Sequence, residues 1–207
     1  MDIAIIANGF LPEHPHLREE ILACRKKIAV DGGMHHLDKM GIIPDLWIGD
    51  FDSASADLEQ KYHHIPRKIF SVDKDLSDTE LAIQEALHFT PTRIFLFAGL
   101  GSRLDHSLSN LLLLGKYTDI LYLVSESEIS FAFTKNLLLS STPGQRFSFL
   151  PLFGPVKVTK SEGLRWPLSK MTLSYHQISL SNEAISPRIE VKLSKGILLC
   201  TTPFIGG

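Results

Sequence analysis

Short apolar runs alternate with longer helical patterns over the first two-thirds of the chain. The apolar runs predict strands at Ile3–Ala7, Lys27–Val30, Leu46–Ile48, Lys68–Val72, Ile94–Phe97 and Ile120–Val124. Apolar residues at helical spacing predict helices over residues 15–26, 34–40, 54–63, 78–89 and 105–116. Because this alternation is typical of βαβ units, we expect a parallel sheet with helices on both faces.

The helical patterns stop after Asn136. The remaining apolar runs predict strands at Phe147–Leu150, Val156–Thr159, Met171–Tyr175, Arg188–Leu193 and Ile197–Thr201. Turn-forming residues separate them, among them Thr142-Pro143-Gly144 and Lys195-Gly196. The predicted fold class is therefore α/β, with a parallel-sheet α/β domain over residues 1–136 and an antiparallel β-sandwich over residues 137–207.

Composition narrows the class of protein. Of the 207 residues, 44% are hydrophobic and 21% are charged, as in an ordinary globular chain. The net charge of -2 provides no basic surface for nucleic acid or for an anionic membrane. The first residues lack the pattern of a secretory signal, and no run reaches the roughly 18 apolar residues of a membrane helix. We therefore expect a cytoplasmic protein in which Cys24 and Cys200 are core residues.

Acidic residues directly follow three of the predicted strands. They are Asp31, the pair Asp50 and Asp52 in Gly49-Asp50-Phe51-Asp52-Ser53, and Asp73, Asp75 and Asp78. Ligands of open α/β sheets bind beyond the carboxyl ends of the strands, where these acids would gather. Two carboxylates about 4 Å apart repel by roughly 1–4 kcal/mol, which a divalent cation would offset. Oxygen ligands favour Mg²⁺, although turn chemistry explains each acid taken alone equally well.

Two further segments suit a phosphate site. Ser77 and Glu80 form a capping-box pattern, which would put Asp78 in the first turn of a helix. The alternative role for Asp78 is that of a favourable capping charge alone. The segment Gly99–His106 predicts a strand, a glycine-containing turn and a helix, with Arg103 available to phosphate oxygens. It is neither a Walker A loop nor a dinucleotide-binding fingerprint.

Together these segments resemble the thiamine pyrophosphokinase family. The resemblance is carried by Asp31-Gly32-Gly33, Pro44–Ser53, Lys74–Asp78, Gly101–His106, Ser161–Leu168 and Ser181-Asn182-Glu183, in the family's order over nearly the whole chain. The Gly-Asp-Phe-Asp-Ser element is specific in that setting, and the other segments are weak singly and strong together. The resemblance implies an ATP-binding catalytic α/β domain, a thiamine-binding β-sandwich and a homodimer.

The resemblance also implies a reaction. ATP would donate its β,γ-pyrophosphate to the hydroxyl of thiamine and leave as AMP, with Mg²⁺ as cofactor. The metal ligands would be Asp50, Asp52 and Asp78, and the catalytic residues Asp78, Arg103 and Asp105. The ATP site would contain Asn8, Asp31, Gly32, Asp75, Gly101 and Arg103, and the thiamine site Ser181, Asn182 and Trp166. The thiamine pocket would lie where the β domain of one subunit meets the α/β domain of the other.

Physical chemistry agrees with these roles but leaves the general base open. Phosphoryl-type transfer depends mostly on positioning and on stabilising spread-out negative charge. The attacking hydroxyl gains from a nearby base, and Asp78 and Asp105 are both candidates, although a metal-bound aspartate is a poor base. The chain departs from the family pattern at three positions, with Ser102 in place of a glycine and with Ser77 and Leu180 in place of threonines. These departures bear on substrate preference more than on reaction type.

Several other residues have less specific interpretations. The paired histidines His14/His16, His35/His36 and His63/His64 lack the spacing of a zinc site and are expected to be solvated or to cap helices. His106 either packs at a helix start or belongs to the site, and Trp166 either packs or lines a ligand pocket. Trp47 is predicted to be core, as is a helix face made of Leu108, Leu111, Leu112 and Gly115.

Four other functions compete with this assignment. A metal-dependent phosphatase or a nucleotide-sugar transferase would use Asp50 and Asp52, but would leave the later motifs without a role. A non-catalytic nucleotide-binding module would bind ATP without turnover. A related pyrophosphokinase for another alcohol is the closest rival, since only the pocket around Ser181 and Trp166 would differ.

Overall fold

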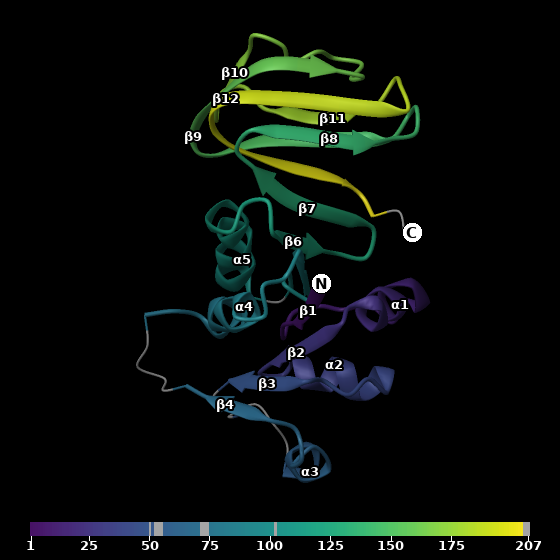
Figure 1. The fold of residues 1–207 in the computed structure, drawn as a ribbon, viewed down its shortest axis with the longest axis vertical. Coiled ribbons are helices and arrows are strands. Elements are labelled where there is room, and N and C mark those ends of the chain that lie inside the picture. Colours follow the sequence, from purple (N-terminus) through teal and green to yellow (C-terminus); the bar gives the residue numbers. More distant parts are fainter. Residues whose placement is uncertain (50, 52–55, 71–74, 102, 205–207) are drawn as a thin grey trace. The chain divides into compact units, whose positions relative to one another are not determined.

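The computed structural model describes residues 1–49, 51, 56–70, 75–101 and 103–204 (Figure 1). The chain divides into two compact units. The first is formed by Met1–Asn110 with Leu123–Glu126, and the second by Leu111–Tyr122 with the described residues from Ser127 to Phe204. The predicted domain boundary at residue 136 stays a prediction.

The first unit alternates strands and helices, as the sequence pattern indicates. Its strands are β1 (Asp2–Ile6), β2 (Lys26–Val30), β3 (Leu46–Gly49), β4 (Arg67–Ile69) and β5 (Arg93–Phe97). Its helices are α1 (Pro15–Ala23), α2 (Gly33–Met40), α3 (Ala56–Lys61) and α4 (Asp78–Leu87), while α5 (Leu104–Lys116) and β6 (Leu121–Val124) have residues in both units. Each of these lies where an element was predicted, with bounds that differ by a few residues.

The strands of the first unit form a parallel sheet in the order β5-β1-β2-β3-β4. In the centre, Ile5 of β1 pairs with Ile28 of β2 on one side and with Leu96 of β5 on the other. The chain moves outward from β1 to β4 and then returns to the opposite side of β1. The carboxyl ends of β1 and β5 therefore flank a topological switch point, where ligands of such sheets bind.

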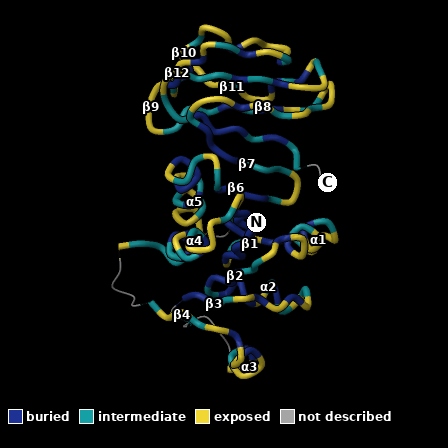
Figure 2. Tube along the Cα trace, in the orientation of Figure 1, coloured by how far each residue is buried: buried dark blue, intermediate teal, exposed yellow. Residues whose placement is uncertain are grey.

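Burial explains why β1 lies at the centre. Residues Ile3–Ile6 are fully buried, so both faces of this strand are covered (Figure 2). Helix α2 packs on β1 and β2, and α4 packs on β1, β2 and β3. Because parallel crossovers are right-handed and the return to β5 runs in the opposite direction, these two helices cover opposite faces. Helices on both faces were predicted.

The buried face of α5 differs from the predicted one. Leu108 and Leu112 are 52% and 50% exposed, whereas Asn110 and Leu114 are 5% and 0% exposed. The four leucines of Leu111–Leu114 extend around the helix, so their spacing alone does not select a face. The prediction of a core face through Leu108 and Leu112 is therefore wrong, while Gly115 is buried as expected.

The second unit is built from antiparallel strands. They are β7 (Glu128–Phe133), β8 (Asn136–Ser140), β9 (Arg146–Glu162), β10 (Thr172–Leu173), β11 (Ser179–Glu183) and β12 (Arg188–Pro203). Strand β12 pairs with β7, β8 and β9, and β9 also pairs with β10 and β11. The mixed α/β fold class, with a parallel sheet and an antiparallel β part, is confirmed.

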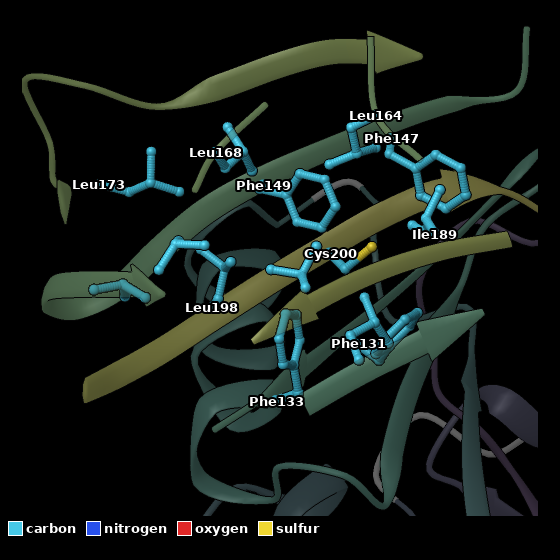
Figure 3. Close-up of a cluster of buried hydrophobic side chains, with 14 of the residues drawn as sticks. Phe131, Phe133, Phe147, Phe149, Leu164, Leu168, Leu173, Ile189, Leu198 and Cys200 are labelled. Atoms are coloured by element: carbon cyan, nitrogen blue, oxygen red, sulfur yellow. The ribbon is translucent and has the colours of Figure 1, made fainter. Parts of the chain in front are cut away.

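The two long strands of the second unit bend around one core. The pairing of β9 with β12 shifts register between Lys192 and Ile197, and such irregularities bend strands. Residues from both halves of β12, Ile189 and Cys200 among them, share one buried cluster with Phe147 and Phe149 (Figure 3). A core enclosed by both halves of bent strands is consistent with the predicted sandwich.

Three details of the β part were predicted incorrectly. The runs expected as separate strands around Phe147 and Val156 belong to β9, and those around Arg188 and Ile197 belong to β12. Lys195-Gly196 forms an irregularity inside β12 rather than a turn, since Gly196 has a φ of 93° within the strand. Strands β7, β8 and β11 were not predicted.

Other expectations for buried residues hold. Trp47 is fully buried, and Cys24 and Cys200 are free thiols in the core. Burial raises the pKa of the Cys24 thiol to about 12, and that of Cys200 is raised by the same cause. Both thiols are therefore protonated at neutral pH. None of the helices in the described part of the chain is long and apolar enough to cross a membrane.

Candidate active site

A cavity of about 420 Å³ lies at the switch point of the parallel sheet. Its walls come from the ends of β1, β2 and β5 and from the starts of α4 and α5. The lining residues are Ala7, Asn8, Gly9, Val30, Asp31, Ser77, Asp78, Thr79, Ala98, Gly99, Leu100, Gly101, Arg103, His106, Ser107 and Asn110. All of them belong to the first unit.

Backbone hydrogen bonds join the loops that follow β1 and β5. The Gly9 N–H donates to the Ala98 carbonyl over 2.8 Å, and the Phe10 N–H donates to the Leu100 carbonyl over 2.6 Å. A Cβ on Gly9 would lie 2.2 Å from the Leu100 oxygen, so only glycine permits this approach. The two loops form one continuous wall of the cavity.

Asp31 is held in a fixed position at the end of β2. Its backbone lies in the left-handed region, with a φ of 45°. The Asp31 N–H donates to the Ile48 carbonyl over 2.8 Å, and the Trp47 indole donates to the Asp31 carbonyl over 3.1 Å. A Cβ on Gly49 would lie 1.8 Å from an Asp31 carboxylate oxygen, so this acid packs directly over the residue that precedes Asp50. Trp47 is thus both a core residue and, through its indole N–H, a hydrogen-bond donor to the Asp31 backbone at the site.

Aromatic rings flank the described residues of the Gly49–Ser53 element. The Phe51 ring packs edge-on against Trp47, with centroids 4.8 Å apart. The Arg67 guanidinium lies 5.0 Å from the Trp47 ring and 5.2 Å from the Phe51 ring, and an ion pair of 2.8 Å joins it to Glu59. Phe51 has a φ of 65°, so these contacts hold it in a backbone conformation that non-glycine residues seldom adopt.

The N-terminus of α4 contributes the acidic wall. The Ser77 hydroxyl accepts from the Glu80 N–H over 3.2 Å, so the predicted cap is confirmed. Asp78 is the first residue of the helix and lines the cavity. The partial positive charge of the helix N-terminus stabilises its carboxylate.

Arg103 and Asp105 form a bidentate pair at the start of α5. Their nitrogen–oxygen distances are 3.2 Å and 2.6 Å, and both side chains are about two-thirds exposed. The Arg103 guanidinium and the His106 N–H lower the pKa of the Asp105 carboxyl to about 2. Asp105 is therefore ionised at neutral pH and is a weak base. Arg103 lines the cavity, and its hydrogen bonds orient it there.

The sequence-based prediction missed several lining residues, among them Ser107 and Asn110. The Ser107 hydroxyl accepts from the Gly101 N–H over 3.1 Å and donates to the Arg103 carbonyl over 3.0 Å. The buried Asn110 amide donates to the Gly99 carbonyl over 2.7 Å. They fix the loop that carries Arg103, and the signal that could have identified Asn110 is a polar residue beside the leucines of a predicted buried helix.

The second unit contains the residues expected to bind thiamine. The Asn182 side chain is 1% exposed, and its amide bonds both backbone groups of Trp166. It accepts from the Trp166 N–H over 3.1 Å and donates to the Trp166 carbonyl over 2.8 Å. The Trp166 side chain is 52% exposed, and Arg165 lies 5.2 Å from its ring. Ser181 has a φ of 53° and donates its N–H to the Ser148 hydroxyl.

Two family models together match most of the chain. The model described as "Thiamin pyrophosphokinase, catalytic domain" matches residues 17–122, and "Thiamin pyrophosphokinase, vitamin B1 binding domain" matches residues 124–198. This chain belongs to the thiamin pyrophosphokinase family. The resemblance read from the sequence motifs is confirmed.

Alignments with similar proteins extend over most or all of this member of the thiamin pyrophosphokinase family. Thiamine pyrophosphokinase of Bacillus subtilis (strain 168) is 30% identical over 190 residues, which cover 83% of this chain and 84% of that protein. Thiamine pyrophosphokinase 1 of Arabidopsis thaliana is 28% identical over 224 residues, or 94% of this chain and 83% of that protein. Thiamin pyrophosphokinase from Geobacillus thermodenitrificans, known from a crystal structure, is 27% identical in sequence. Its structure matches with a TM-score of 0.88 over 100% of this chain and 99% of that one.

Family membership narrows the functions that the sequence left open. It argues against a phosphatase or a nucleotide-sugar transferase, because the thiamin pyrophosphokinase models match both units. The structure brings Asn8, Asp31, Asp78, Gly101 and Arg103 to one cavity, and their roles there stay predictions. Three further predicted site residues, Gly32, Asp75 and Asp105, do not line that cavity. Asp50 and Asp52 lie outside the described residues.

The histidine interpretations have mixed outcomes. His14 caps α1 by accepting from the His16 N–H, as a capping role predicts. His106 is exposed and lines the cavity, which favours a site position over packing. His36 is half-buried rather than solvated, and its ring bonds the Gly9 carbonyl.

Proposed function

We propose that this chain transfers the β,γ-pyrophosphate of ATP to the hydroxyl of thiamine, giving thiamine diphosphate and AMP. In this reaction the thiamine oxygen forms a bond to the β-phosphorus. The bond from that phosphorus to the oxygen bridging it to the α-phosphorus breaks, and AMP leaves with the bridging oxygen. The hydroxyl proton passes to a base or to water. Residues 1–136 would bind ATP, and residues 137–207 would bind thiamine.

The cavity at the switch point is the observation that supports an ATP site. Glycine-containing loops after β1 and β5 and the N-terminus of α4 line it. The partial positive charge at the N-terminus of α4 suits phosphate oxygens, and the glycines let the loops approach them closely. Arg103 adds a fixed cation that can pair with phosphate oxygens and stabilise the charge that spreads over them during transfer.

The acids suit a hard divalent cation. Asp78 contributes a carboxylate to the cavity wall, and we propose that Asp50 and Asp52 complete an oxygen ligand set for Mg²⁺. A bound Mg²⁺ would neutralise phosphate oxygens and orient the transferred group. Asp31, packed over Gly49, would keep the end of β3 in place.

The pKa of Asp105 bears on the identity of the general base. A carboxyl whose pKa is about 2 accepts a proton poorly at neutral pH. We therefore propose that Asp105 acts by orienting Arg103 through their bidentate pair. Asp78 remains a candidate base only to the extent that it is not bound to metal.

At the thiamine end, we propose that Asn182 acts through Trp166. The Asn182 amide oxygen accepts from the N–H groups of Trp166 and Glu183, and its nitrogen donates to the Trp166 carbonyl and the Ser179 hydroxyl. These bonds use the side chain's full hydrogen-bonding capacity. Its part in thiamine binding would be to hold the exposed Trp166 ring, which can stack on an aromatic or cationic ring.

Replacing Asn182 with alanine is expected to raise the KM for thiamine and to lower the free energy of unfolding by about 2 kcal/mol, since buried hydrogen bonds are lost. The KM for ATP should not change. Steady-state kinetics and urea unfolding would measure both effects. Asn182→Asp keeps the acceptor for the Trp166 N–H but loses the donor to its carbonyl, so it should also raise the KM for thiamine. An unchanged KM for thiamine in Asn182→Ala would contradict the role of Trp166.

We also propose that the chain works as a homodimer. Leu104, Leu108 and Leu112 follow one another at four-residue intervals on α5 and are 72%, 52% and 50% exposed. An exposed apolar stripe of this kind is typical of a protein interface. We place the enzyme in the cytoplasm, where its nucleotide substrate is held.

The mass in solution tests the dimer. Light scattering should give about twice the 23.1 kDa of one chain, and Leu108→Glu should shift the mass toward the monomer. Leu22→Glu, at an exposed leucine of α1, is the control and should leave the mass unchanged. A monomeric wild-type protein at micromolar concentration would refute the proposal.

A product assay tests the reaction itself. The purified protein would be incubated with ATP, Mg²⁺ and thiamine, and the products separated by chromatography. Equal amounts of AMP and thiamine diphosphate are expected. ADP or free phosphate would instead indicate a kinase or a phosphatase. AMP formed only with another alcohol would keep the mechanism and replace the substrate, and ATP binding without turnover would identify a binding module.

A further inference from the structure

Gly9 separates two cavities of the first unit. It lines the cavity that contains Asp78 and also a second cavity of about 520 Å³ beside α1 and α2. The residues around the second cavity are Gly9, Phe10, Leu11, Glu13, His14, Pro15, Arg18, His36, Lys39 and Met40. The Gly9 backbone therefore borders both cavities, and different residues bond it on each side.

On the side of the second cavity, His36 bonds this backbone. Its Nε2 lies 2.9 Å from the Gly9 carbonyl oxygen. Because a carbonyl can only accept, the ring must carry its proton on Nε2. Burial lowers the pKa of His36, so the ring is neutral at neutral pH. The neutral Nε2–H tautomer satisfies this geometry.

On the other side, the backbone of Gly9 and Phe10 is bonded to the loop after β5. The Gly9 N–H donates to the Ala98 carbonyl, and the Phe10 N–H donates to the Leu100 carbonyl. His36 thus fixes the Gly9–Phe10 peptide through its carbonyl, while the N–H of that peptide is held by Leu100. The His36 bond spans 27 residues of sequence and joins α2 to the wall of the candidate ATP site.

We propose that His36 is a positioning residue for the nucleotide, holding the Gly9 backbone in the conformation that receives ATP. The inference rests on the proposed function for the identity of the nucleotide. His36 itself does not line the cavity that contains Asp78, so it acts through Gly9 alone. Its contribution is to preorganise a wall that would otherwise have to be ordered on binding.

ATP binding to side-chain variants tests this role without any need for turnover. Titration of the full-length protein with ATP and Mg²⁺, in the absence of thiamine, would give the Kd for ATP. His36→Phe keeps an aromatic ring but removes the donor, and it is expected to raise this Kd by roughly 3- to 10-fold, as loss of one hydrogen bond implies. His36→Gln places an amide donor near the position of Nε2 and should restore the Kd to within about 2-fold.

Matched controls separate positioning from stability. His35→Gln, at the exposed neighbouring residue of α2, should leave the Kd unchanged. His36→Asn carries the same amide on a shorter side chain that does not reach Gly9, so it should resemble His36→Phe. If His36→Phe does not fold, the comparison of the glutamine and asparagine variants still decides the question. Thermal melts of each variant would show whether affinity follows the hydrogen bond or the Tm.

We expect the change in KM to be confined to one of the two substrates. In His36→Phe the KM for ATP is expected to rise while the KM for thiamine stays the same. An unchanged Kd for ATP in His36→Phe, or a glutamine variant as weak as the phenylalanine one, would overturn the inference. If wild-type protein binds ATP but makes no thiamine diphosphate, the proposed reaction fails while the binding comparison still tests His36.

Discussion

Replacing Asp78 with asparagine is expected to lower kcat/KM for thiamine diphosphate formation by about 10²- to 10³-fold. The substitution keeps the shape of the side chain and removes the negative charge that Asp78 contributes to the cavity wall. A neutral amide binds Mg²⁺ more weakly than a carboxylate, so the phosphates of ATP would be held less well. Steady-state assays at several Mg²⁺ concentrations would measure the effect, which should shrink as the metal concentration rises.

The fold should tolerate this change. Asp78 is in the first turn of α4, where its interaction with the helix dipole contributes about 0.3–1 kcal/mol, and the Ser77 cap remains. Asp57→Asn is the matched control, because Asp57 is an exposed acid in the first turn of α3. It should leave kcat/KM unchanged. Full activity of Asp78→Asn at limiting Mg²⁺ would remove Asp78 from the metal ligand set.

The parallel sheet could be predicted because its signals are local. The run Ile3–Ala7 is apolar throughout, and a strand buried on both faces requires just such a run. Ser77 and Glu80 mark the start of α4 in the same way, since a cap depends on residues three positions apart. The convergence of loops after β1, β2 and β5 then follows from the strand order.

The β part was harder because its pairing is not local. Gly196 predicts a turn when only its neighbours are considered, yet β12 continues through it. The partner strand β9 supplies hydrogen bonds on both sides of the irregularity, and its residues are more than 30 positions away in the sequence. A glycine at a strand irregularity and a glycine in a turn have the same local sequence signal.

Tertiary contacts also decide which face of α5 is buried and which residues support the site. Asn110 is buried because the Gly99 carbonyl, at the end of another element, accepts its hydrogen bond. His36 was expected to be solvated or to cap a helix because nothing near it in sequence indicates that Gly9 needs a partner. Motifs identified residues that face the cavity, such as Asp78 and Arg103, and also Ser77 and Asp105 beside them. The supporting residues His36, Ser107 and Asn110 became visible only in the fold.

Replacing Arg103 with alanine should reduce kcat/KM about as strongly, by roughly 10²- to 10³-fold. Arg103 lines the cavity and is oriented by two hydrogen bonds to Asp105, so its charge is already in position when ATP binds. Arg103→Lys keeps a positive charge but cannot form bidentate contacts, either with phosphate or with Asp105. We expect it to recover only part of the lost activity, and burst-phase measurement of AMP would show whether the loss lies in the chemical step.

Folding should be nearly unaffected, because the Arg103–Asp105 pair is exposed and such pairs contribute little to stability. Arg146→Ala is the matched control, since Arg146 also forms an exposed ion pair, with Glu128, in the second unit. It should retain wild-type kcat/KM. If Arg103→Ala and Arg146→Ala were equally active, Arg103 would be only a surface ion-pair residue. A large loss confined to Arg103→Ala, with an unchanged Tm, would leave stabilisation of phosphate charge as the explanation, because the fold would be intact and the Asp78 carboxylate still present.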